Sequence, residues 1–215
     1  MKRIAVILAA LALLGGQAFA QIVPGAGYIH STLTTNSGGS TDNDSKSGFY
    51  AGASVNFEIP AVKGLGFVPG AYLSLITSTK QDSQSASVFG ITFTQSGKAV
   101  FNELALNVPT LLKYSIDLSG AKLFAYAGPT FQLGIISRLD VEASGIISGS
   151  SNWDYYADDS GYNRFNVLVG GGIGFQLSRV IVNLGYDYGI TNVYRGLSNV
   201  SGNRSNLHLG IGYAF

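Results

Sequence analysis

Few residues of this 215-residue chain could do acid–base, nucleophilic or metal chemistry. It has two histidines, His30 and His208, and no cysteine, so the sequence offers no disulfide framework and no Cys-based metal site. A Ser-His-acid site would need one of these histidines beside a serine or aspartate, yet the sequence has no Gly-x-Ser-x-Gly elbow and no histidine pair at metal-ligand spacing. We therefore expect no catalytic residue, no metal and no cofactor, and predict that the protein is not an enzyme.

The elements that carry the remaining polar residues show a period of two. In the final stretch, 204–215, the apolar positions are Leu207, Leu209, Ile211, Tyr213 and Phe215, separated by His208, Gly210, Gly212 and Ala214. Successive side chains of a strand point to opposite faces, so this stretch has one apolar face and one small or polar face. Such a strand suits a transmembrane barrel, in which the last strand closes against the first and leaves no edge. The alternative is an edge strand of a soluble β-sandwich.

Seven earlier segments have strand character, although the period is blurred in the first, where the directions of Tyr28 and His30 stay open. They are 23–33, 48–58, 66–78, 100–116, 122–135, 164–177 and 180–192. The connections alternate between long polar runs, such as 34–47, and short turns, such as 178–179. We interpret 34–47 as an exposed loop, whereas 79–98 contains an apolar stretch, 88–93, that could extend a strand beyond the membrane. The sequence predicts an all-β fold, an eight-stranded antiparallel up-and-down transmembrane β-barrel with both termini periplasmic and long extracellular loops.

The first twenty residues have the pattern of a secretory signal. Lys2 and Arg3 precede an apolar run, 4–14, and the small-x-small triplet at Ala18 and Ala20 marks a cleavage site. The run is shorter than the roughly 20 residues of a membrane-spanning helix. We predict a signal peptide at 1–20, cleaved after Ala20, and a barrel domain at 21–215 in the bacterial outer membrane; an N-terminal membrane anchor is the alternative.

The composition fits this prediction and excludes one class of partner. Charged residues make up 12% of the chain, against about 25% in an ordinary soluble domain. Removal of Lys2 and Arg3 takes the formal net charge from +1 to −1. The mature chain therefore has no basic field that would attract nucleic acid.

Three stretches resemble the small outer-membrane β-barrel proteins of Bacteroidota, the porin-family or PorT-like barrels. They are 106–114 (Leu-Asn-Val-Pro-Thr-Leu-Leu-Lys-Tyr), 127–129 (Ala-Gly-Pro), and 186–192 (Tyr-Asp-Tyr-Gly-Ile-Thr-Asn) with the terminal 210–215. The resemblance implies an outer-membrane barrel but no particular activity. It also implies that Tyr213 and Phe215 act as the terminal aromatic signal read by the barrel-assembly machinery. Outer-membrane lipids and periplasmic chaperones would be the other partners.

An eight-stranded barrel is just wide enough for side chains to fill its interior. The predicted inward-facing ionisable residues are Glu58, Glu103, Lys113, Asp187, Arg204 and His208. The uncharged polar residues predicted beside them are Tyr50, Tyr72, Asn107, Tyr126, Gln132 and Gln176. Because charges away from water must be paired and hydrogen-bonded, we expect a polar network that fills the barrel, and hypothesise that Lys113 pairs with Glu103 or Asp187. A narrow pore through the network is the alternative.

The stretch 152–159 mixes carboxylates with aromatic rings on the longest polar connection. Trp153, Asp154, Tyr155 and Tyr156 are candidates for surface recognition, although a solvated loop without a partner fits equally well. Calcium binding by the aspartates is weakly supported because EF-hand spacing is absent. The function classes that remain are a structural or surface-binding barrel with an unknown ligand, a small-diameter porin, an accessory barrel of a secretion or envelope complex and, least supported, a lipid-modifying enzyme.

Overall fold

The computed structural model describes residues 20–88, 91–144, 149–157, 161–196 and 199–215. The predicted signal peptide, Ala18 included, lies outside these ranges except for Ala20, where the first strand begins. No helix among the described residues has the length and hydropathy needed to cross a membrane.

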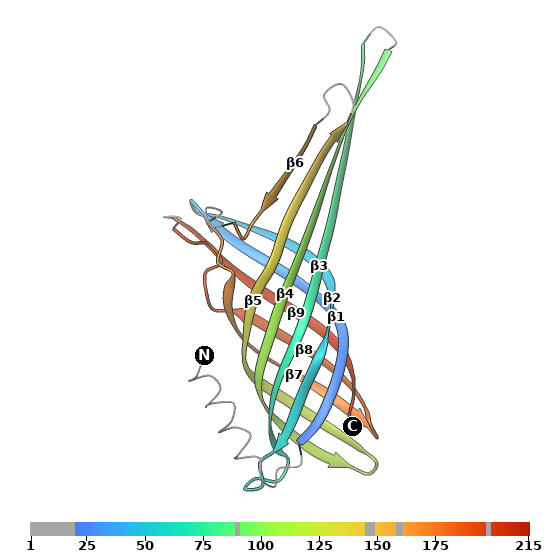
Figure 1. Ribbon diagram of the computed structural model, residues 1–215, viewed down its shortest axis with the longest axis vertical. Helices are drawn as coiled ribbons and strands as arrows, with labels where there is room; N and C mark the ends of the chain where they lie inside the picture. Colours follow the sequence, from blue (N-terminus) through green and yellow to red (C-terminus); the bar gives the residue numbers. More distant parts are fainter. Residues whose placement is uncertain (1–19, 89–90, 145–148, 158–160, 197–198) are drawn as a thin grey trace.

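The described chain folds into one antiparallel sheet that closes into a barrel (Figure 1). Its strands are β1 (Ala20–Ser37), β2 (Ser40–Glu58), β3 (Leu65–Val88), β4 (Ile91–Leu118), β5 (Ala121–Ser144), β6 (Gly149–Asp154), β7 (Phe165–Leu177), β8 (Val180–Gly189) and β9 (Val200–Tyr213). Eight of them form the ring, because β4 pairs with β5 and β1 pairs with β9, while β6 pairs only with β5. The predicted eight-stranded up-and-down barrel is confirmed.

The ring is closed by β1 and β9, which pair continuously from Gly25 opposite Gly212 to Ser37 opposite Val200. This closure leaves no strand edge within the ring, as a lipid environment requires. It also fixes the two side chains whose direction the sequence leaves open. Tyr28 and His30 face outward, where the Tyr28 hydroxyl donates to Ser47 Oγ at 2.6 Å and His30 Nδ1 lies 3.0 Å from the same oxygen.

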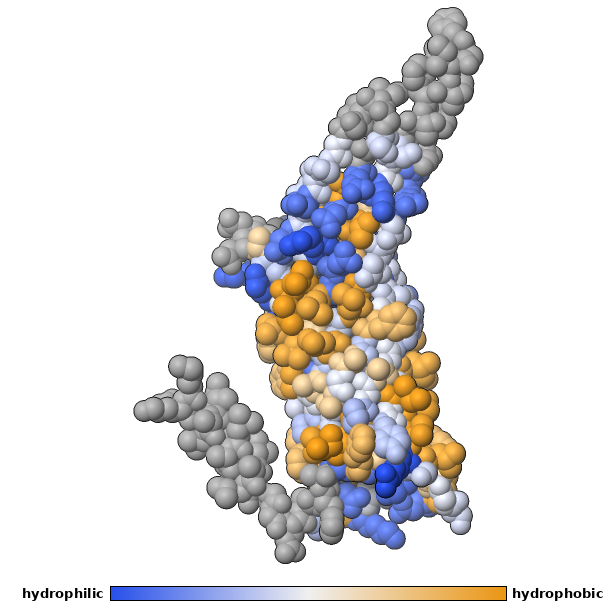
Figure 2. Space-filling view, turned by 45° about the vertical axis from the view of Figure 1, so that its right-hand side comes forward, coloured by the Kyte–Doolittle hydropathy of each residue, from blue (hydrophilic) through white to orange (hydrophobic). Residues whose placement is uncertain are grey.

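The outer wall of the barrel carries an apolar belt with hydrophilic margins at both ends (Figure 2). Its exposed side chains include Phe49, Leu73, Leu112, Leu133, Ile173, Leu184, Leu209 and Ile211. A register shift opposite Leu104 and Ala105 places two consecutive residues, Ile135 and Ile136, on this face. Apart from this bulge the alternation holds around the ring, so the outward residues present a lipid-facing surface and the inward ones fill the lumen.

The polar run 34–47 is not a loop, so that prediction is wrong. β1 and β2 continue through it as a paired hairpin that ends in a two-residue turn at Gly38 and Gly39, whose φ angles are +57° and +86°. Both residues occupy the left-handed region that the favoured tight hairpin turns demand and that glycine adopts freely. The strand extension considered for 79–98 is present, with β3 and β4 paired as far as Val88 opposite Ile91.

The strands extend much further beyond the barrel at one end, which we call the outer end, than at the other, the inner end. At the inner end the turns are short, as at Ser178–Arg179, where Leu177 pairs with Val180. At the outer end β3, β4 and β5 rise well beyond the other strands, with β6 laid along β5 (Figure 1). This projection is built largely from residues for which the sequence predicts polar connections. Following the usual arrangement of such barrels, we take the inner end as periplasmic and the outer end as extracellular.

Candidate functional site

A buried ion pair crosses the lumen. Glu103 on β4 and Arg204 on β9 are 3% and 9% exposed, and their strands lie on opposite sides of the ring. Arg204 Nη2 donates to Glu103 Oε2 at 3.0 Å, and Nη1 donates to Oε1. This bidentate arrangement is the strongest that a guanidinium and a carboxylate can form. It ties the two walls of the barrel together.

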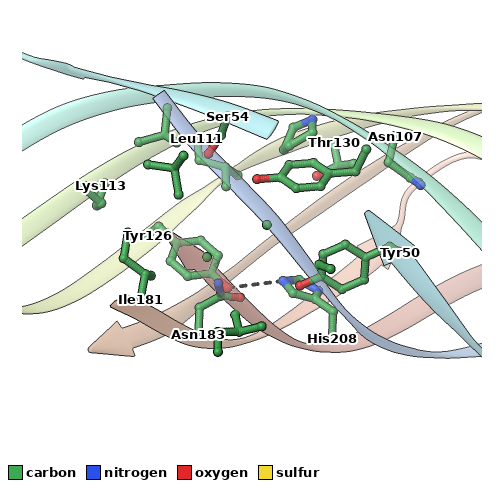
Figure 3. Close-up of a pocket in the computed structure, with 18 of the residues that line it drawn as sticks. Tyr50, Ser54, Asn107, Leu111, Lys113, Tyr126, Thr130, Ile181, Asn183 and His208 are labelled. Atoms are coloured by element: carbon green, nitrogen blue, oxygen red, sulfur yellow. Dashed lines mark hydrogen bonds between the residues drawn. The ribbon is translucent and has the colours of Figure 1, made fainter. Parts of the chain in front are cut away.

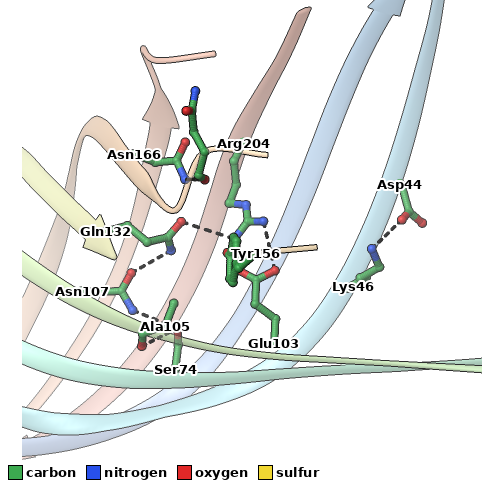
Figure 4. Close-up of polar contacts among 11 residues, drawn as sticks. Asp44, Lys46, Ser74, Glu103, Ala105, Asn107, Gln132, Tyr156, Asn166 and Arg204 are labelled. Carbon is green, nitrogen blue, oxygen red and sulfur yellow. Dashed lines mark hydrogen bonds and ion pairs between the residues drawn. The ribbon is translucent and has the colours of Figure 1, made fainter. Parts of the chain in front are cut away.

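Three uncharged side chains extend this pair across β5, β4 and β3 (Figure 4). Arg204 Nη1 donates to Gln132 Oε1 at 3.3 Å, and Gln132 Nε2 donates to Asn107 Oδ1 at 2.8 Å. Asn107 Nδ2 in turn donates to Ser74 Oγ at 2.9 Å. The connected hydrogen bonds satisfy polar groups that would otherwise be costly to bury.

Tyr156 enters the same layer from the segment after β6. Its side chain is 5% exposed, and its hydroxyl donates to Glu103 Oε1 at 3.3 Å. Arg164 holds the segment in place by donating from Nε to the Tyr156 carbonyl at 3.0 Å. The ring packs where β5 has Gly134, and a Cβ there would overlap it. Tyr156 is therefore not on an exposed loop, as the sequence predicts, because its side chain is buried in the barrel filling.

We call this layer the septum. It comprises Ser74, Ile76, Glu103, Asn107, Gln132, Tyr156, Leu168 and Arg204. Four of these, Ser74, Ile76, Gln132 and Leu168, are the largest fully buried side chains of the described chain. The septum lies between two cavities that share no lining residue, an inner one and an outer one.

The inner cavity has a volume of about 170 Å³ and contains His208 (Figure 3). His208 Nε2 lies 3.2 Å from the Tyr126 hydroxyl, and Nδ1 lies 3.7 Å from Asp187 Oδ2. The imidazole stacks on Tyr126 and meets Tyr50 edge-on, with ring centroids 6.5 and 6.3 Å away. Gly185 leaves room for this group, since a Cβ there would overlap His208. The histidine is a packed network residue here.

An apolar cluster lies at the inner end of this cavity. It consists of Val23, Phe124, Ile181 and Ala214, with Tyr126 packed against it. Lys113 lies beside it, with Nζ 5.4 Å from the Phe124 ring centroid.

The hypothesis that Lys113 pairs with Glu103 or Asp187 is wrong. Glu103 pairs with Arg204, Asp187 faces His208, and no ion pair among the described residues involves Lys113. Two further residues that were predicted to face the interior, Glu58 and Gln176, lie at the periplasmic rim. Glu58 is exposed, and Gln176 donates from its side-chain amide to the Ser178 carbonyl at 3.0 Å.

The outer cavity is larger, at about 380 Å³, and rests on the septum. Four tyrosines line it, namely Tyr155, Tyr156, Tyr162 and Tyr194. Burial raises the pKa of Tyr155 and of Tyr162, so both phenols stay neutral at physiological pH. Their rings form a row in which Tyr162 lies 5.0 Å from Tyr155 and 4.9 Å from Tyr194 between centroids.

Paired charges line the mouth of the outer cavity. Asp44 Oδ2 lies 2.7 Å from Lys46 Nζ, and Asp44 Oδ1 lies 3.1 Å from Lys80 Nζ. Burial alone would raise the pKa of the Asp44 carboxyl, but the hydrogen bonds and charges of the two lysines outweigh it and lower the pKa below its ordinary value. This carboxylate is therefore charged throughout the physiological pH range.

The two remaining recognition candidates, Trp153 and Asp154, have different surroundings. Trp153 is on β6 and is 56% exposed, whereas Asp154 Oδ1 accepts the Tyr156 backbone N–H at 2.8 Å. Asp158 and Asp159, considered for calcium, lie outside the described residues. Within the described part of the chain, no three metal-ligating side chains gather at one place. Sequence reasoning missed Tyr162 and Tyr194, which lie outside the alternating segments and carry no period.

A family model described as outer membrane protein beta-barrel domain matches residues 16–195. The chain therefore belongs to this family of outer-membrane β-barrel proteins, and the bacterial outer membrane is its location. No curated protein sequence matches the chain.

Solved outer-membrane barrels resemble the chain at low identity. Neisserial surface protein A is 15% identical over 91% of this chain and 99% of that chain, with a TM-score of 0.41. Ail of Yersinia pestis, in complex with the heparin analogue sucrose octasulfate, is 14% identical over 91% and 99%, with a TM-score of 0.37. OprG of Pseudomonas aeruginosa is 12% identical over 91% and 95%, also at 0.37.

Proposed function

We propose that this protein is a closed, non-conducting outer-membrane barrel that works as a surface-binding protein through its extracellular strands and outer cavity. The septum carries the proposal. A diffusion pore needs a continuous water path, and the bidentate pair of Glu103 and Arg204 lies in a layer of fully buried side chains across the lumen. The projection of β3, β4 and β5 supplies a large surface above the membrane.

Conductance of the refolded mature protein in a planar lipid bilayer tests the proposal. We expect no conductance above that of the bare bilayer. Folding is confirmed by the heat-dependent gel shift typical of such barrels. The double variant Glu103→Ala, Arg204→Ala removes the ion pair without leaving a lone charge and should admit ions. A wild-type protein that shows discrete, ion-selective steps would replace this function with the small porin.

The other roles are weaker proposals. Catalysis on lipids has little support, because His208 faces the lumen between Tyr50 and Tyr126 rather than the lipid. A role as an accessory barrel of a secretion or envelope complex, like membership of the PorT-like barrels of Bacteroidota, rests on the resemblance of three stretches alone. Outer-membrane lipids are the proposed partner of the apolar belt.

The barrel-assembly machinery and periplasmic chaperones are the proposed partners during biogenesis. Phe215 is 72% exposed, packs on Tyr213 at 4.9 Å between ring centroids and donates its backbone N–H to the Ile22 carbonyl at 3.1 Å. We predict that deletion of Phe215 lowers the amount of folded protein in the outer membrane, measured by fractionation. Phe215→Tyr, which keeps a terminal ring, should assemble normally. Normal outer-membrane levels of the deletion variant would refute this assignment.

A further inference from the structure

We propose that the outer cavity binds a neutral saccharide, such as the terminal sugar of a glycan chain. This inference rests on the proposed surface-binding function and names the ligand class of that surface. The cavity's charge balance, its row of aromatic rings and its closed floor favour this ligand.

Charge balance excludes a strongly ionic ligand. The charged side chains that line the cavity are Asp42, Asp44, Glu103, Lys46, Lys80 and Arg204, three of each sign. Both lysines are held by Asp44, and Arg204 is held by Glu103. A phosphate or sulfate would have to compete with Asp44 and Glu103 for these cations, whereas a neutral ligand leaves the pairs intact.

The aromatic row suits the shape of a sugar ring. Phe101, Tyr155, Tyr162 and Tyr194 follow one another with centroid separations of 5.8, 5.0 and 4.9 Å. Tyrosines held by their neighbours offer wide contact area with little loss of conformational entropy. The negative π-face attracts the positively polarised C–H groups of a pyranose, while the hydroxyl rim of the sugar turns toward polar groups.

Hydrogen-bonding groups lie beside the row. Thr35 Oγ1 is 2.9 Å from the Tyr194 hydroxyl. Asp42 pairs with Thr35 across β1 and β2 and is exposed at the cavity mouth. A carboxylate accepts hydrogen bonds from adjacent hydroxyls of one sugar, so Asp42 and Thr35 supply the polar contacts that complement the stacking.

The closed floor makes the outer cavity a binding pocket rather than an entrance. At about 380 Å³ it falls in the usual range for small-molecule sites, about 300–1,000 Å³. The septum blocks its inner side, so the ligand enters and leaves at the extracellular side. The inner cavity, at about 170 Å³, is behind the septum and is not part of the site.

The test is a calorimetric titration of the mature protein in lipid nanodiscs, which avoids detergents with sugar headgroups. The neutral probes are maltose, lactose and N,N′-diacetylchitobiose, and the anionic probes are a heparin disaccharide and inorganic phosphate. We expect saturable binding of at least one neutral probe and none of the anions. Tyr194→Ala should weaken it about tenfold or more, the loss of roughly 1.4 kcal/mol of contact energy. The control is Tyr188→Ala, a lipid-facing tyrosine that is 51% exposed, and it should bind as the wild type does.

A second variant keeps the test independent of folding. Asp42 is exposed, so Asp42→Ala should weaken binding several-fold while the unfolding midpoint stays unchanged. The inference is overturned if no neutral probe saturates, if an anion binds more tightly than every neutral probe, or if both variants bind like the wild type. A silent bilayer without sugar binding rejects only the saccharide, whereas a conducting wild-type protein rejects the closed barrel whatever the titration gives.

Discussion

Tyrosines line both cavities, one on either side of the septum, but they have different roles in the two. Tyr50 and Tyr126 of the inner cavity pack around His208, with an apolar cluster on one side and the septum on the other. Tyr162 and Tyr194 of the outer cavity also pack on each other, but their cavity lies on the extracellular side of the septum. Position relative to the septum therefore decides whether a lumen tyrosine fills space or can meet a ligand.

The largest effect on the septum, which lies between the two cavities, is expected when one partner of the buried ion pair is removed. Glu103→Ala leaves the Arg204 guanidinium buried without a counter-charge, which costs about 3–5 kcal/mol. We expect the free energy of unfolding in urea, measured on protein folded into lipid vesicles, to fall by that amount.

The matched control for this change is the double variant Glu103→Ala, Arg204→Met. It carries no lone charge, so it should recover much of the lost stability. Equal instability of the single and double variants would mean that the pair contributes through packing rather than through charge.

A second change pushes the septum apart without altering charge. Gly134→Val places side-chain atoms where the Tyr156 ring lies, and overpacking of this kind costs about 1–3 kcal/mol. We expect the segment around Tyr156 to leave the lumen and become sensitive to added protease, measured by the rate of cleavage next to Tyr156. Gly97→Val, at an exposed position with open space around it, is the control and should leave that rate unchanged.

A smaller change tests the inner compartment by itself. Ile181 is 7% exposed in the apolar cluster at the inner end of the inner cavity. Ile181→Val removes one methylene and should lower the free energy of unfolding by about 0.5–1.5 kcal/mol. Sugar binding at the outer cavity should not change, and a weakened titration would show that the septum fails to isolate the two compartments.

The smallest effect concerns pH at the outer mouth. The folded-state pKa of Asp44 is lowered, so its stabilising contribution is complete above the ordinary carboxyl pKa of about 4 and is lost as the pH falls through the folded-state value. Because the Asp44 side chain is 34% exposed and solvent screens its ion pairs, we expect less than about 1 kcal/mol. NMR amide shifts of β2 and β3 near Lys46 and Lys80 should follow this titration. Asp44→Asn should abolish it, and an unchanged curve in that variant would assign the titration to another group.

The alternation of apolar and polar residues predicted most of the barrel. Each strand of the wall has one face toward lipid and one toward the lumen, so its side chains must alternate. The strand faces around Leu209 and His208 follow directly from a period of two. The same rule fails above the membrane, where both faces of a strand meet water. The run 34–47 therefore looks like a loop although its backbone is fully paired.

The partners inside the lumen were harder to predict. The alternation of apolar and polar residues shows which side chains point inward, but not how far along the barrel axis each one lies. Glu103 and Lys113 share a face of β4, but ten residues at about 3.3 Å each put them about 33 Å apart. That distance alone could have excluded their pairing. The true partner of Glu103, Arg204, is 101 residues away in sequence, and only the order of strands in the closed ring brings the two together. Tyr156 escaped prediction because it reaches the lumen from outside any ring strand.

β4 runs without interruption from Ile91 at the tip of the projection, through Glu103, to Leu118 at the periplasmic end. Its partner β5 has the register shift beside Leu104 and Ala105, and bulges are where strands bend. Because one strand carries both the tip and Glu103, the projecting hairpin is mechanically connected to the septum. A sideways displacement of the tip is passed along β4 to Glu103, which Arg204 holds from the opposite side of the ring.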